Sequence, residues 1–86
     1  MERRKGAWLT VVHDIPEENL QELLEYCAGA ALRDRTFQYT VYPDRVVIYS
    51  PTKDKAYRRG SLLHHRYGCY YEVFYAKPSN IINGGG

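Results

Sequence analysis

The sequence predicts a small α+β domain with the element order β-α-β-β-α-β. Two stretches place apolar residues three and four positions apart, which is typical of amphipathic helices. Runs rich in Val and Tyr flank these stretches and are typical of strands, at residues 8–15, 36–42, 45–49 and 70–76. Eighty-six residues, 44% of them hydrophobic, suffice for one domain with one modest core.

The first strand, residues 8–15, is predicted to run directly into the first helix. Asp14 is expected to cap this helix through its side chain, with Pro16 in the first turn and Glu17 near the positive end of the helix dipole. Gly29 is expected to mark fraying or an early end of the helix. One face of the helix carries the residues expected in the core, which are Leu20, Leu23, Leu24, Cys27 and Ala31.

A β-hairpin is predicted next, with residues 36–42 and 45–49 as its strands and Pro43-Asp44 as its turn. Strict alternation divides the first strand into two sets of side chains, Phe37, Tyr39 and Val41 on one side and Gln38, Thr40 and Tyr42 on the other. In the second strand both sets are apolar enough for a core, so the register stays open. At least one aromatic side chain faces outward in either register.

The second helix is predicted to begin at Ser50-Pro51, with the Ser50 side chain as its cap, and to end at Gly68. Its core face repeats at four, three and four residues, through Ala56, Gly60, Leu63 and Tyr67. The other faces of this helix are basic, whereas the first helix is acidic. The basic side chains are Lys53, Lys55, Arg58, Arg59, His64, His65 and Arg66.

With right-handed crossovers, this order gives a ferredoxin-like fold, an antiparallel sheet in the order 4-1-3-2 with both helices on one face and the other face open. The domain is expected to span residues 8–78. Residues 1–7 are expected to form a flexible basic N-terminus, and residues 79–86 a flexible Gly-rich tail.

Two segments resemble the RNA recognition motif (RRM) family. The first is Val12-His13-Asp14-Ile15-Pro16-Glu17-Glu18 with the leucine-rich helix behind it, and the second is Val73-Phe74-Tyr75-Ala76-Lys77-Pro78-Ser79. The element order is similar from about Trp8 to Pro78, and the chain also resembles the degenerate RRM of nuclear mRNA export receptors. The family's usual aromatic signatures are missing, because Thr10 or Val11 stands on the first strand and DRVVIYS on the third offers only Tyr49. The resemblance therefore implies a noncanonical RRM.

Single-stranded RNA is the first predicted partner. Aromatic side chains on the strands would stack unpaired bases and basic ones would hold phosphates, with residues 3–5 as an electrostatic supplement. The residues predicted to form this surface are Tyr39, Tyr42, Arg45, Tyr49, Tyr70, Phe74 and Lys77. The simpler alternative is that these tyrosines only cover a small sheet.

A protein partner is the second hypothesis. Here the domain is an adaptor or inhibitor module, for example of viral or phage origin, which binds an acidic protein through the second helix. The residues predicted for this contact are Lys55, Arg58, Arg59 and Arg66. A homodimer through the edge strand, residues 36–42, is a further prediction.

Enzymatic, metal-binding and membrane roles are not expected. Adjacent His64 and His65 diverge by about 100° on a helix, so they cannot share one metal ion, and His13 is expected to be structural. Cys27 and Cys69 lack metal-ligand spacing and are expected to be buried thiols in an intracellular protein of the nucleus or cytoplasm. A net charge of +2, from twelve basic and ten acidic residues, does not indicate a partner by itself. No cofactor is predicted.

Overall fold

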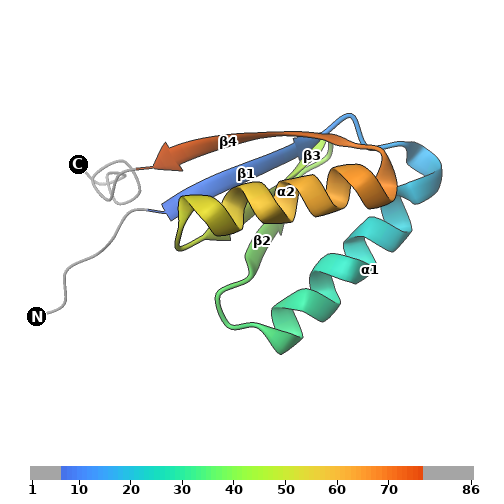
Figure 1. The fold of residues 1–86 in the computed structure, drawn as a ribbon. Coiled ribbons are helices and arrows are strands. Elements are labelled where there is room, and N and C mark those ends of the chain that lie inside the picture. Colours follow the sequence, from blue (N-terminus) through green and yellow to red (C-terminus); the bar gives the residue numbers. More distant parts are fainter. Residues whose placement is uncertain (1–6, 77–86) are drawn as a thin grey trace, which may run out of the picture.

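The computed structural model describes residues 7–76 and confirms the predicted element order (Figure 1). The predicted flexible ends, including the basic residues 3–5, lie outside the described residues, apart from Ala7, and so do Lys77 and Pro78 at the end of the predicted domain. The elements are β1 (Ala7–His13), α1 (Glu17–Arg33), β2 (Gln38–Val41), β3 (Arg45–Ser50), α2 (Lys53–Tyr67) and β4 (Tyr70–Ala76).

The four strands form one antiparallel sheet in the order β2-β3-β1-β4, as predicted. β1 lies at the centre, where Val12 faces Val46 of β3 and Tyr71 of β4. Thr10 faces Ile48 on one side and Val73 on the other. Both helices pack on the side of the sheet to which these residues point, and Figure 1 shows α2 lying along β1 and β4.

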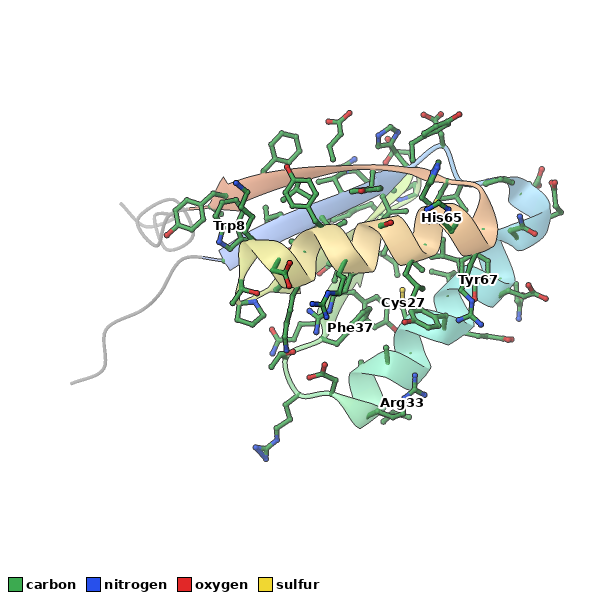
Figure 2. The ribbon with its side chains drawn as sticks, in the orientation of Figure 1. Trp8, Cys27, Arg33, Phe37, His65 and Tyr67 are labelled. Carbon is green, nitrogen blue, oxygen red and sulfur yellow. The ribbon has the colours of Figure 1, made fainter. Side chains whose placement is uncertain are left out.

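The core lies between this side of the sheet and the two helices. Figure 2 shows Cys27 pointing from α1 into this layer. The fully buried side chains of the core include Val12, Leu23, Cys27, Ile48, Ala56, Leu63 and Cys69. Both cysteines are free thiols, as expected. Burial raises the pKa of Cys27 to about 11, and it also raises the pKa of Cys69.

The register of β3, which the alternation left open, places Val46 and Ile48 in the core and Val47 on the other side of the sheet. Val47 is nevertheless 7% exposed, because β3 is a central strand flanked by β2 and β1. Val47 is therefore shielded from water as well as Val46 and Ile48, which explains the run of three apolar residues in the middle of this strand.

α1 differs from the prediction at both ends. Asp14 has a positive φ of 51° and lies three residues before Glu17, so the residue at the N-cap is Pro16 and no side chain caps the helix. The Asp14 carboxylate instead lies 2.8 Å from Nδ1 of His13. Gly29 does not end the helix, which continues to Arg33 and thereby places Ala30 in the core.

α2 also begins later than predicted. Thr52, not Ser50, is the capping residue, and its hydroxyl accepts a hydrogen bond from the backbone N–H of Lys55. Ser50 is instead the last residue of β3 and is buried. Gly68 ends the helix in the left-handed conformation, with φ of 77°, as its position predicted.

Within the described residues, neither helix combines the length and the apolar composition that crossing a membrane requires.

Candidate functional site

The side of the sheet that faces away from the helices is the open face. Its residues alternate with the core residues of each strand, and cross-strand pairing arranges them in rows. One row runs from Tyr49 of β3 through Leu9 of β1 to Phe74 of β4. The next row contains Thr40, Val47, Val11 and Glu72, and the third contains Arg45, His13 and Tyr70.

Aromatic rings stand on both sides of the apolar centre of this face. Phe74 is 49% exposed, Tyr70 is 58% exposed, and Tyr49 is half-buried. Because each strand adds about 4.8 Å, Tyr49 and Phe74 stand about 10 Å apart with Leu9 between them. Three of the predicted stacking residues therefore share one uncovered surface.

The aliphatic side chains between these rings were not among the predicted site residues. Leu9 and Val11 lie on the open face, whereas Thr10 lies on the core side and donates its hydroxyl to the carbonyl oxygen of Ala56 at 2.8 Å. The alternation of side chains along β1 was enough to place Leu9 and Val11 together on one side of the strand and Thr10 on the other. The resemblance to RRMs drew attention to aromatic residues on β1, and Leu9 and Val11 are aliphatic.

The positive charge of the described part of the open face comes mainly from Arg45. Its guanidinium lies 2.8 Å from the Asp44 carboxylate and 4.6 Å from the centroid of the Tyr42 ring. Tyr42 follows the end of β2 and is 38% exposed. Arg45 and Tyr42 thus lie together beside the hairpin turn, at the end of the open face.

His13 lies between two carboxylates on the same face. Its Nδ1 is 2.8 Å from Asp14 Oδ2, and its Nε2 is 3.4 Å from Glu72 Oε2. Its ring centroid is 6.5 Å from that of Tyr70. Three carboxylates, those of Asp14, Asp44 and Glu72, thus stand beside one guanidinium, so the described part of the open face has no excess of positive charge.

Tyr39 is the one predicted stacking residue that is described and lies on the wrong side of the sheet. It faces Ile48 across the β2–β3 pair and packs against the core, with its ring centroid 6.1 Å from that of Phe37. Tyr39 is therefore not available to stack a base on the open face.

Arg59, predicted to meet a protein partner, is instead held within the fold. Its side chain is 13% exposed, and its guanidinium donates hydrogen bonds to Ser50 Oγ at 2.7 Å, Thr36 Oγ1 at 2.8 Å and Asp34 Oδ2 at 3.1 Å. It also lies 4.9 Å from the Phe37 ring centroid. Arg59 thus ties α2 to β3 and to the segment that precedes β2.

The other predicted basic residues of α2 remain closer to the surface. Arg58 is exposed and pairs with Asp54 one turn earlier at 2.9 Å. Arg66 is exposed and lies 5.4 Å from the Tyr26 ring centroid and 5.9 Å from that of Tyr67. Lys55 is half-buried. The basic surface of α2 is thus reduced by one internal arginine and one ion pair.

The adjacent histidines of α2 lie edge to face, with their ring centroids 5.2 Å apart. Nδ1 of His64 lies 2.7 Å from the carbonyl oxygen of Cys69, whereas His65 points away from the core into solvent (Figure 2). Within residues 7–76 no three His, Cys, Asp or Glu side chains are grouped to hold a metal ion.

Comparisons with models of known protein families, with curated proteins and with solved structures find no match.

Proposed function

We propose that this domain binds single-stranded RNA on the open face of its sheet. The observation that carries the proposal is the row Tyr49, Leu9, Phe74, in which two accessible aromatic rings flank an aliphatic side chain on an uncovered surface. Rings presented in this way stack unpaired bases, and each stacked base contributes about 1–3 kcal/mol. Tyr70 extends the same surface along β4.

Because the described face has no excess of positive charge, base stacking contributes more to the binding free energy than phosphate contacts do. Arg45 is the basic side chain at the end of this face. Each phosphate contact to a single strand steepens the fall of log affinity with log salt concentration by about 0.7. Raising the salt concentration fourfold therefore weakens binding only about 2.6-fold per contact of this kind. Replacing Arg45 with Gln is expected to remove this part of the salt dependence and to leave most of the affinity for RNA.

The test compares two neighbouring residues of β4 with equal exposure. Phe74 is 49% exposed on the open face, and Tyr75 is 48% exposed on the opposite face. With a short RNA that occupies one copy, Phe74→Ala is expected to weaken binding about 5- to 150-fold, the equivalent of one stacked base, and Tyr75→Ala to leave it unchanged. Equal losses from both variants, or none from Phe74→Ala, would contradict the proposal.

The alternative function, contact with an acidic protein through α2, rests on Arg58, Arg66 and Lys55. Arg59 belongs to the fold, and its substitution would test stability instead of binding. The suitable variant is Arg58→Glu combined with Arg66→Glu. If this double variant loses the function of the protein and Phe74→Ala keeps it, the adaptor or inhibitor role is favoured over RNA binding.

A further inference from the structure

β4 forms the second edge of the sheet and is the longer of the two. Within residues 7–76 it pairs only with β1, and it spans seven residues, whereas β2 at the other edge spans four. Proteins protect sheet edges with short strands, lysine, proline or bulges. β4, with the sequence YYEVFYA, contains no lysine or proline, and its one charged residue is Glu72.

Exposed aromatic side chains lie on both sides of this edge. Tyr70 and Phe74 lie on the open face, and Tyr75 lies on the helix side. Trp8 stands where β1 begins (Figure 2), with its ring centroid 4.8 Å from that of Tyr75. Aromatic residues are enriched where proteins associate, because they bury much apolar area at a low entropic cost.

The flank of α2 beside β4 carries one charged side chain, Lys53 at the start of the helix, whose Nζ lies 5.7 Å from the Trp8 ring centroid. Tyr57 packs against Tyr71 of β4, and His64 lies beside Tyr70, with Ser61 between them at helical spacing. The opposite flank carries Arg59 and Arg66, which point toward Phe37 and Tyr26, respectively. From Tyr57 to His64 the surface next to β4 is thus aromatic and free of Lys, Arg, Asp and Glu, which suits a partner of the same kind.

We propose that β4 pairs with β4 of a second copy of this chain, antiparallel and with Val73 on the two-fold axis. The strand is self-complementary in this register, which places Tyr71 opposite Tyr75, Glu72 opposite Phe74, and Tyr70 opposite Ala76 of the other copy. No two like charges face each other directly. The sheets join into one of eight strands, with both open faces on the same side.

The helices fit this arrangement. α2 lies over β1 and β4, one strand spacing of about 4.8 Å from the proposed axis. The two α2 helices would then lie about 10 Å apart, close to the usual helix packing distance of about 8–10 Å. A homodimer through the edge of β2, the sequence-based prediction, would have only four residues to pair.

The first test is the mass in solution, measured by light scattering over a wide range of concentrations without RNA. The expected result is twice the mass of one chain, and a monomer throughout would overturn the proposal. Tyr75→Lys places a charge at the interface twice and is expected to raise the dimer dissociation constant about tenfold or more. The matched control is Val41→Lys on β2, since Val41 is 50% exposed and Tyr75 is 48% exposed. Dissociation by the control alone would assign the contact to β2.

The second test does not depend on how well Tyr75→Lys folds. Under mild oxidation Val73→Cys is expected to form a covalent dimer, because residues directly opposite each other lie about 4.5–5.5 Å apart. Ala76→Cys is expected not to, since its two copies would be six residues, or about 20 Å, apart. Cys27 and Cys69 are buried and do not interfere. Cross-linking of Ala76→Cys but not Val73→Cys would overturn the register. Because neither test contains RNA, its result is separate from that of the proposed function.

Discussion

Replacing Gly60 with alanine tests how closely α2 approaches the sheet. Gly60 is buried in α2 above Tyr71 of β4. A Cβ at this position would lie 2.6 Å from Cγ and 2.7 Å from Cε2 of the Tyr71 ring. Carbon atoms pack at about 3.5–4.0 Å, so the helix or the ring has to move. The Cγ atom is held close to the backbone of β4, which leaves the ring little freedom to avoid the clash.

Two effects of opposite sign set the expected result. Alanine favours a helix interior over glycine by about 1 kcal/mol. Overpacking of one methyl group costs about 1–3 kcal/mol, and the upper part of this range applies because several ring atoms are involved. We expect Gly60→Ala to lower the free energy of unfolding by about 1–2 kcal/mol, which corresponds to a fall in Tm of about 4–16 °C for a domain of this size.

The control is the same substitution at Gly29 in the middle of α1. Its added Cβ would meet Nη1 of Arg33 at 3.3 Å, the end of a flexible side chain that can move aside. Gly29→Ala is therefore expected to stabilise the protein by about 0.5–1 kcal/mol. Urea unfolding followed by circular dichroism measures both variants. If Gly60→Ala is as stabilising as Gly29→Ala, the close packing of α2 on Tyr71 is refuted. In a Tyr71→Ala background, Gly60→Ala is expected no longer to destabilise the protein.

Three further predictions concern the polar links and the thiols. Arg59→Ala is expected to destabilise the fold by about 2–3 kcal/mol because it leaves Ser50 and Asp34 without their charged donor. Arg59→Lys is expected to restore only part of this stability. Urea unfolding measures both variants. The side-chain and backbone hydrogen bonds from Thr36 lower the pKa of Asp34. Its stabilising contribution is therefore complete above its ordinary pKa of 3.8 and is lost as the pH falls through the lower folded value, so Asp34→Asn is expected to flatten the acid limb of stability against pH. With a pKa of about 11, Cys27 is expected to react at pH 8 at least about a hundredfold more slowly with a thiol reagent in the folded protein than in urea, and equal rates would contradict its burial.

Local sequence signals were sufficient for the order and type of the elements and for the end of α2 at Gly68, but not for the N-terminal caps of the helices. Ser50 and Thr52 both flank Pro51, and both are preferred capping residues by type, Ser more so than Thr. The choice depends on Arg59, whose guanidinium binds the Ser50 hydroxyl and keeps that residue in β3. This contact joins positions nine residues apart and is invisible to a pattern of neighbours. Asp14 fails as a cap because it lies three residues before Glu17, and its carboxylate lies beside His13 instead.

The candidate site was predictable in part. Alternation correctly separated Tyr39 from Gln38 and Thr40, but it did not say which set faces the helices, because aromatic residues occur in both sets of the predicted strand. Tyr49 faces outward because its neighbour Ile48 fills the core, a choice that depends on the whole layer of side chains beneath it. The register of a central strand with apolar residues on both sides is fixed by packing and not by periodicity.

The most direct test of RNA binding on the open face is an NMR titration of the labelled protein with mixed-sequence single-stranded RNA, at two salt concentrations. The expected result is a set of backbone amide shifts centred on Leu9, Tyr49 and Phe74 that includes Arg45 and weakens only modestly as salt increases. No shifts at physiological salt, or shifts confined to α2, would contradict RNA binding on this face.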